Sequence, residues 1–419
     1  MESFDSIKEN PEWAFDNVRS VEQWTHGFHR YPAKFLPNVV KKIIEKYHCG
    51  RENAIIADLL AGCGTTLVEA KAHGIASVGV DINPVATMIT SAKINTLEPE
   101  RLQRAFYSLS ETIDKYTSGM PLELPLHPRI AYWFREQEIH KLAYLYRSIG
   151  EGSYSHEEEQ FFYVAVSHTL KSCSRWLQCS TKPQRDPQKK IADPLHEFRV
   201  HCTRMMRKNE DFYRHLQENC IADVRCEIRL EDAKHTSIPD NSIDTIITSP
   251  PYVTSYEYAD IHQLTGYWMG FFSNLSEFRK NFIGTSFSGS KSLECTTEHA
   301  AKIVEELAAK NKCIAKNVAS YFREMDEVAS EMYRILKPGG KACIVIGNTK
   351  IRDVMITSAE VFMDFLLNKG FCKVDIIKRN IPCKLMPTLR DCVTGRFTTL
   401  SSKNCRKVYP CEYIIIVKK

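Results

Sequence analysis

The chain of 419 residues is 43% hydrophobic and 26% charged, which is ordinary for a globular protein of two domains or one large elaborated domain. No apolar run reaches about 18 residues and the first twenty residues contain no signal-peptide core, so we expect neither a membrane span nor export. Fifteen cysteines in a chain without an export signal favour a reducing cytoplasm. They include no CxxC pair, which argues against a structural zinc site.

Positive charge is concentrated in one segment. The net charge is +5, yet residues 168–216 alone carry eleven Lys and Arg against five Asp and Glu. A basic island on a nearly neutral body suits a polyanion such as nucleic acid. A solvated helix face would have the same composition, so the charge alone leaves both interpretations open.

Residues 1–25 read as a lead-in segment, and an extended, proline-punctuated stretch over residues 26–37 follows it. It leads into an expected helix over residues 38–46, with Asn38 as the N-cap and an apolar stripe along one face. The local chemistry of this stretch indicates little by itself. Its position directly ahead of the next element matters more.

That element is a glycine-rich turn between a strand, residues 54–57, and a helix that starts near Thr65. The turn contains Gly62 and Gly64, whose backbone can approach a ligand closely because glycine has no Cβ. The following strand ends in Asp81, where doubly wound nucleotide folds bind a ribose hydroxyl pair. Because the third glycine of the dinucleotide fingerprint is missing, the pattern favours one nucleoside without a pyrophosphate.

Residues 97–225 are too long for a loop and must carry their own structure. Apolar periodicity predicts helices over 142–149, 157–170 and 197–216. Between the last two, residues 180–190 are polar, proline-broken and basic, which predicts a surface loop whose side chains suit the phosphates and base edges of a nucleic acid. The candidate nucleic-acid-binding residues are Lys182, Gln184, Arg185, Gln188, Lys189 and Lys190.

A buried strand over residues 243–247 ends in the run 248–252, Thr-Ser-Pro-Pro-Tyr. Neither proline can donate to a sheet, so the carbonyls of Ser249 and Pro250 form a stiff array beside Tyr252. Such an array can accept hydrogen bonds from a planar amino group while the ring stacks on its heterocycle. An ordinary Pro-Pro loop would have the same sequence, and the glycine turn is what favours the functional interpretation.

The remaining elements complete the expected sheet. Residues 283–297 are rich in Gly and Ser, which suits either a loop that orders on the substrate or a plain linker. One long helix is expected over 297–336, then a turn at 336–340 and a strand over 341–346. Strands near 374–377 and 413–417 would end the fold.

The turn at residues 58–65 (DLLAGCGT), Asp81 and TSPPY together resemble an S-adenosylmethionine-dependent DNA amino-methyltransferase. The Ser of SPPY resembles the cytosine-N4 branch. The resemblance implies an α/β, Rossmann-like methyltransferase sheet, doubly wound and mostly parallel, with a large helical insertion. The N-terminal segment and cofactor-binding half would occupy 1–96, the insertion with target recognition 97–225, and the catalytic half 226–419.

The resemblance implies S-adenosylmethionine as the cofactor, no metal, and double-stranded DNA as the partner, with a separately acting restriction endonuclease in a restriction-modification system. It indicates no oligomeric state. The cofactor-binding residues would be Tyr31, Pro32, Lys34, Phe35, Asp58, Ala61, Gly62, Gly64, Thr65, Thr66, Asp81, Ile82, Asp232, Ala233 and Ser249. The catalytic residues would be Ser249, Pro250, Pro251 and Tyr252.

Several other chemistries compete with cytosine-N4 methylation. Adenine-N6 methylation of DNA, base methylation of RNA, and a catalytically silent DNA-binding subunit all fit parts of the pattern. Carbon-5 methylation of cytosine requires a cysteine nucleophile after a proline. The Pro-Cys pairs at 382–383 and 410–411 do not follow a central strand, and Tyr252 occupies the place where that cysteine belongs.

Overall fold

The computed structural model describes residues 4–15, 22–48, 50–124, 127–253, 257–287, 289, 292–381, 389–391, 398, 401–403, 405–407 and 411–419. Within these residues, seven strands form a central sheet in the order β3-β2-β1-β4-β5-β11-β8. The strands are β1 (Ile55–Asp58), β2 (Ala76–Asp81), β3 (Cys226–Leu230), β4 (Ile243–Thr248), β5 (Leu336–Ile346), β8 (Cys372–Asn380) and β11 (Cys411–Lys418). The first five run parallel, and β11 is antiparallel to both β5 and β8. The mostly parallel, doubly wound sheet predicted from the sequence is confirmed.

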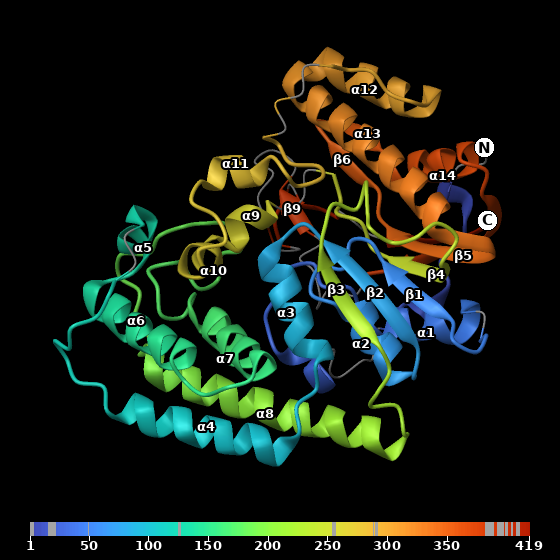
Figure 1. The fold of residues 1–419 in the computed structure, drawn as a ribbon. Coiled ribbons are helices and arrows are strands. Elements are labelled where there is room, and N and C mark those ends of the chain that lie inside the picture. Colours follow the sequence, from blue (N-terminus) through green and yellow to red (C-terminus); the bar gives the residue numbers. More distant parts are fainter. Residues whose placement is uncertain are drawn as a thin grey trace.

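Helices cover both faces of this sheet (Figure 1). Ile56 and Ile247 pack on one face with α1 (Pro37–Tyr47) and with α2 (Thr65–Ala72) beside it. Their neighbours Ala57 and Ile246 pack on the other face with α13 (Lys312–Ile335) and α14 (Ser358–Asn368). Successive residues of a strand point to opposite faces, so a strand buried on both sides is mostly apolar.

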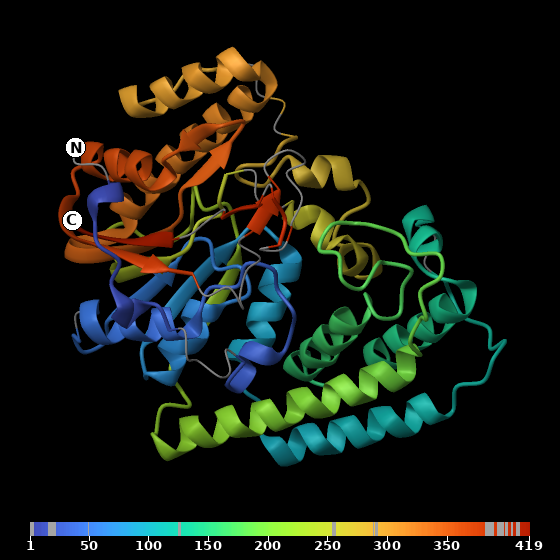
Figure 2. The ribbon, with the colours of Figure 1, turned by 180° about the vertical axis from the view of Figure 1, so that it is seen from behind.

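A bundle of helices lies beside the sheet, as Figures 1 and 2 show from opposite sides. The chain leaves β2 through α3 (Pro84–Ile94) and then forms α4 (Pro99–Asp114), α5 (Pro128–Trp133), α6 (Glu136–Gly150), α7 (His156–Thr169) and α8 (Pro194–Glu218). Fully buried aromatic side chains, including Phe161, Phe162 and Phe198, fill its core. The predicted helices at 142–149, 157–170 and 197–216 are confirmed as α6, α7 and α8, whereas α4 and α5 were not predicted.

The start of α1 differs from the sequence prediction. The helix begins at Pro37, and Leu36 is the N-cap without a side-chain hydrogen bond, so Asn38 is not the cap. Proline suits the first helical position because its fixed φ is helical and its missing N–H would have had no partner there.

The single helix predicted over residues 297–336 was wrong. Two helices, α12 (Glu298–Lys310) and α13, meet at Asn311, whose backbone is extended (φ −159°) and whose side chain caps α13. The turn predicted at 336–340 lies within β5. There the pairing with β4 jumps from Ile243–Leu336 to Thr245–Lys341, so the intervening residues bulge out of the ladder.

The remaining elements are short. They are η1 (Phe4–Ser6), η2 (Pro11–Trp13), η3 (Trp24–Gly27), α9 (Tyr258–Ile261), α10 (Gln263–Trp268), α11 (Leu275–Arg279), β6 (Thr349–Ile351), β7 (Val354–Ile356), β9 (Leu389–Asp391) and β10 (Cys405–Lys407). The two ends of the chain lie side by side in both views, where the ring of Phe4 packs against Tyr413 at 5.3 Å between centroids. Among the helices that the structure describes, none combines the length and apolar character needed to cross a bilayer.

Candidate active site

A pocket lies at the carboxyl ends of the central strands, where the strand order reverses between β1 and β4. This switch point is the usual ligand site of open α/β sheets. Twelve of the fifteen residues predicted to bind the cofactor line it. They are Tyr31, Lys34, Phe35, Asp58, Ala61, Gly62, Thr65, Asp81, Ile82, Asp232, Ala233 and Ser249.

The two glycines of the turn after β1 have different surroundings. Gly62 (φ +53°) lines the pocket, and a Cβ there would lie 3.5 Å from the ring of Tyr31. Gly64 (φ +76°) is the N-cap of α2, and a Cβ there would lie only 2.5 Å from the side chain of Thr90. Gly62 therefore keeps the pocket wall open, whereas Gly64 allows the turn to pack on α3.

Asp81 ties the end of β2 to this turn. Its carboxylate accepts the backbone N–H of Gly62 and that of Asn83, each at 2.8 Å. Burial outweighs these hydrogen bonds and raises the pKa of Asp81 to about 7. The side chain is thus a strong acceptor at the pocket wall whose charge changes near neutral pH.

Asp58 has the corresponding position at the end of β1. Its Oδ1 accepts the hydroxyl of Thr248 at 2.6 Å and the N–H of Leu60 at 3.1 Å. Burial raises the pKa of Asp58 to about 6. The bond to Thr248, the last residue of β4, joins the glycine-turn side of the pocket to the TSPPY side.

The Ser-Pro-Pro run follows β4 into the same pocket. Ser249 and Pro251 line it, whereas Pro250 is buried and does not. The hydroxyl of Ser249 donates to the carbonyl of Val345 at 3.0 Å, and the carbonyl of Pro251 accepts the hydroxyl of Tyr321 at 3.0 Å. The run is therefore fixed to β5 and α13, which leaves the lone pairs of the Ser249 hydroxyl as acceptors.

Tyr252 follows Pro251 but is not part of the pocket wall. Its hydroxyl donates to Oε2 of Glu412 at 2.7 Å. Burial and this nearby carboxylate raise the pKa of Tyr252 well above its ordinary value, so the hydroxyl stays protonated.

Three residues predicted to bind the cofactor lie outside the pocket wall. Gly64 serves the turn, and Thr66 is buried with its hydroxyl 3.4 Å from the carbonyl of Ile247. Pro32 is half-buried in the stretch before α1. The glycine-turn pattern alone could not separate residues that face a ligand from residues that shape the turn.

Several wall residues were missed by sequence reasoning: Ala33, Leu59, Leu60, Cys63, Tyr258, Asn281, Phe282 and Ile283. Asn281 and Phe282 come from the chain just after α11, and Ile283 is the first residue of the segment 283–297 predicted to be either a loop that orders on the substrate or a plain linker. Glu257 accepts the Thr285 hydroxyl at 3.1 Å and the Ser286 backbone N–H at 3.0 Å, so this segment is held at its far end. The apolar pair Phe282 and Ile283, directly before Gly284, was the sequence feature that could have indicated these wall residues.

The predicted DNA-binding loop lies between α7 and α8. Lys182, Gln184, Arg185, Gln188 and Lys190 are exposed. Lys189 is different, because its ammonium donates to the carbonyls of Lys171 at 2.6 Å and Trp176 at 2.7 Å.

Lys189 therefore holds the loop together, and burial lowers its pKa to about 8. Sequence reasoning also missed Tyr132 of α5. The guanidinium groups of Arg129 and Arg185 lie over this half-exposed ring, at 4.8 and 5.1 Å from its centroid.

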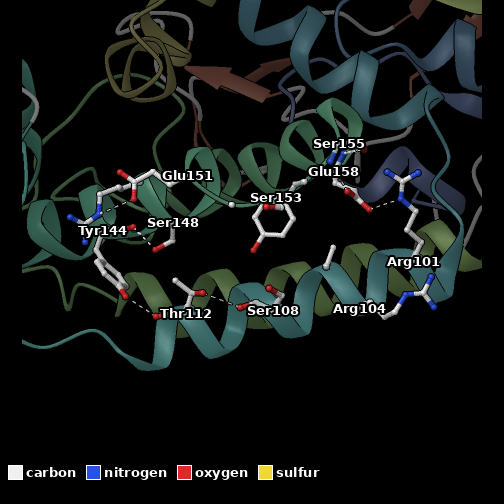
Figure 3. A pocket seen from close by; sticks show the side chains of 14 residues that line it. Arg101, Arg104, Ser108, Thr112, Tyr144, Ser148, Glu151, Ser153, Ser155 and Glu158 are labelled. Atoms are coloured by element: carbon white, nitrogen blue, oxygen red, sulfur yellow. Dashed lines mark hydrogen bonds and ion pairs between the residues drawn. The ribbon is translucent and has the colours of Figure 1, made fainter.

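A second, polar hollow lies within the helical insertion and is shown in Figure 3. It is formed by α4, α6, α7 and the connection between the last two, without any residue of the sheet. Arg101 is paired with the buried Glu158 at 2.9 Å, and the hydroxyl of Tyr144 donates to the carbonyl of Thr112 at 2.7 Å. Arg101, Glu158 and Tyr144 therefore already have partners within the insertion.

The chemistry of the first pocket fits S-adenosylmethionine. Among the described residues, the hydrogen-bond donors to Asp58 and Asp81 are neutral N–H and O–H groups. Both buried carboxylates would be stabilised by a cationic ligand and by ribose hydroxyls. Gly62 leaves open the space that such a ligand needs.

No three His, Cys, Asp or Glu side chains are placed to share a metal ion within the part of the chain that the structure describes. The Pro-Cys pairs considered for carbon-5 chemistry lie outside it, apart from Cys411 at the start of β11.

Comparison with known proteins agrees with this geometry. The family model described as DNA methylase matches residues 4–91 and 243–419, which is more than half of the chain. The chain is 28% identical over 404 residues to Type II methyltransferase M.MvaI of Kocuria varians, covering 88% of this chain and 87% of that protein. It is 23% identical over 407 residues to Type II methyltransferase M.BsoBI of Geobacillus stearothermophilus, covering 83% and 77%.

Among solved structures, a SAM-dependent methyltransferase of Methanosarcina mazei covers 90% of this chain and 96% of its own, with 11% identity and a TM-score of 0.31. The sheet, the pocket and the family match lead to one assignment. The chain belongs to the DNA methylase family and is an S-adenosylmethionine-dependent DNA methyltransferase of the N4/N6 class.

Proposed function

We propose that this chain methylates the exocyclic N4 amine of a cytosine flipped out of double-stranded DNA at a specific site. The observation that carries the proposal is the position of Ser249. Its neutral side chain lines the same pocket as Gly62 and Asp81, at the place where the SPPY pattern resembles the cytosine-N4 branch.

The residues act mainly by holding the reacting amine. The lone pair of a cytosine amine is delocalised into the ring, so the amine is a poor nucleophile. The oxygen atoms of Ser249, which lines the pocket, can accept its hydrogens and favour the pyramidal, nucleophilic form. S-adenosylmethionine supplies the electrophilic methyl group, and positioning then contributes most of the rate.

A base inside a duplex cannot reach this pocket and must be flipped, at a cost of a few kcal/mol. We propose that stacking on Tyr252 offsets part of this cost. On the DNA side, we propose that the exposed cations of the 180–190 loop bind phosphates and that Gln184, Arg185 or Gln188 reads bases. The enzyme would act in the cytoplasm, where its DNA is, and protect sites from a separately acting restriction endonuclease.

The second candidate is methylation of adenine N6 in DNA. The family match covers both amino groups, and the pocket geometry would hold either. Methylation of an RNA base is a third candidate. Neither has an observation in its favour comparable with the Ser at position 249.

Product analysis tests the proposal. Double-stranded oligonucleotides and RNA are incubated with the enzyme and isotopically labelled S-adenosylmethionine, digested to nucleosides and analysed by mass. We expect labelled N4-methylcytosine from DNA alone. Labelled N6-methyladenine as the main product would overturn the cytosine assignment, and label in RNA alone would overturn the DNA assignment.

A further inference from the structure

The hydroxyl of Tyr252 is anchored by a carboxylate far away in the sequence. It donates at 2.7 Å to Oε2 of Glu412, the second residue of β11. The side chain of Glu412 is only 12% exposed, and its other oxygen is paired with Arg379 of β8. The ring that follows the SPP run is therefore attached to the antiparallel end of the sheet.

Arg379 extends this anchor to the beginning of the chain. Its side chain is buried, and its Nε donates to the backbone carbonyl of Trp13 at 2.7 Å. Both sides of the Glu412 carboxylate are thus engaged, one by a cation that is itself held in place. These linked interactions fix the position of the Glu412 carboxylate, and with it that of the Tyr252 hydroxyl oxygen.

Gly347 confines the same end of the ring from another side. It follows the last residue of β5, and a Cβ added to it would lie 2.9 Å from Cε2 of Tyr252. Contacts under 3.0 Å are too short for real Cβ atoms, so any side chain at position 347 would displace the ring. The hydroxyl end of Tyr252 is therefore held by a hydrogen bond and by close packing.

We propose that Glu412 and Gly347 are positioning residues that set the plane of Tyr252 for the flipped base. The inference rests on the proposed role of Tyr252 as the stacking surface. A buried tyrosine hydroxyl commonly has a hydrogen-bond partner, but that of Tyr252 meets a carboxylate that is itself paired with a buried arginine, while Gly347 confines the ring from another side. A stacking surface must present its face at a fixed angle, since small errors in the placement of reacting groups are costly in rate.

The anchor is tested by Tyr252→Phe, which keeps the stacking ring and removes the hydroxyl. We expect kcat to fall about tenfold, with the dissociation constant for S-adenosylmethionine unchanged. The matched control is Tyr47→Phe. Tyr47 also donates its hydroxyl to a carboxylate, Asp375, at 2.8 Å, but it lies on α1 away from the pocket, and its loss should leave kcat unchanged.

A double-mutant cycle separates anchoring from general destabilisation. Glu412→Ala should lower kcat by a factor similar to that of Tyr252→Phe, and the double variant should be hardly worse than either. Gly347→Ala should give the same defect by displacing the ring while the Glu412 carboxylate remains. Because Glu412→Ala leaves Arg379 without its partner and can fail to fold, Tyr252→Phe and Gly347→Ala keep the test decisive.

A fluorescent readout reports the ring directly. 2-Aminopurine at the target position of the duplex is quenched when it stacks on an aromatic ring, so we expect brighter complexes with Tyr252→Phe and Gly347→Ala. Wild-type kcat and quenching in both variants, or an equal loss of kcat in Tyr47→Phe, would overturn the proposal. The identity of the methylated nucleoside is measured on the wild type, so the cytosine assignment can fail while the anchor stands, and the reverse.

Discussion

Asp81 accepts the backbone N–H of Gly62 at 2.8 Å, so the acidic end of β2 closes the glycine turn that follows β1. The same carboxylate accepts the N–H of Asn83 at the start of α3. Two elements of the pocket wall therefore depend on one side chain. The protonation state of Asp81 should therefore change the affinity of the pocket for its ligand.

We expect S-adenosylmethionine to bind more weakly as the pH falls through about 7. Burial raises the pKa of Asp81 to about 7, so the carboxylate is present above that pH and is neutralised below it. A carboxylate accepts ribose hydroxyls more strongly than the neutral acid. Affinity should fall by up to about tenfold per pH unit below 7, as measured by calorimetry between pH 6 and 8.

Asp81→Asn is the control for this dependence. The amide cannot titrate. Its NH₂ group is a donor, so it would face one of the two backbone N–H donors without forming a hydrogen bond. We expect weaker binding at all pH values and a flat profile between pH 6.5 and 8. A profile as steep as that of the wild type would assign the pH dependence to another group.

The two glycines of the turn should respond differently to a methyl group. Gly62→Ala places a Cβ at an ordinary 3.5 Å from Tyr31, so it should fold, at a cost of about 1–2 kcal/mol for the left-handed backbone, and lose most affinity for S-adenosylmethionine. Gly64→Ala clashes with Thr90 at 2.5 Å and should unfold at a clearly lower temperature. Thermal unfolding with and without cofactor distinguishes the two, and equal cofactor affinity in Gly62→Ala and the wild type would contradict the assignment.

Arg185 and Lys189 lie in one loop, but their replacement should have different effects on DNA binding and on stability. Arg185 is exposed, so Arg185→Ala should leave stability unchanged and weaken DNA binding, with the salt slope reduced by about one if it binds a phosphate. Lys189 donates to the carbonyls of Lys171 and Trp176, so Lys189→Ala should cost about 1–3 kcal/mol of stability. DNA titrations at several salt concentrations and denaturant unfolding measure the two effects, and the reverse pattern would exchange the two roles.

The sequence predicted those pocket residues whose type is restricted by the backbone conformation or by their place at a strand end. Gly62, Asp81 and the Ser-Pro-Pro run stand at strand ends, and strand ends of a parallel sheet meet at one edge. The glycine turn and TSPPY were each predicted to follow a strand directly, and these two strands, β1 and β4, are neighbours in the sheet. These positions are specified by a few residues close together in the chain.

Contacts between distant segments could not be predicted in this way. Nothing near Tyr252 in the sequence indicates that its hydroxyl meets Glu412, 160 residues later. The break at Asn311 was missed because both flanking segments have the same apolar period, and only the side-chain cap distinguishes them. Lys189 looked like its exposed neighbours because charge does not reveal burial.

A group of buried histidines provides the last prediction. The ring of His201 stacks on that of His168 at 3.6 Å between centroids, and its Nε2 lies 2.8 Å from the carbonyl of Phe28. Burial lowers the pKa of His201 to about 4, below the value of about 6.5 in an unfolded chain. Between pH 6.5 and 4 the unfolded state therefore binds a proton at His201 that the folded state does not bind, and the free energy of unfolding decreases as the pH falls through this window.

His201→Gln removes this titration. Relative to the wild type, the free energy of unfolding of the variant should therefore improve by about 3 kcal/mol between pH 7 and pH 4. Buried carboxyl groups such as Asp58 and Glu69, whose pKa values are raised, titrate alike in both proteins and cancel in the comparison. Denaturant unfolding at several pH values measures the difference, and parallel curves for the two proteins would show that His201 is not held neutral by the fold.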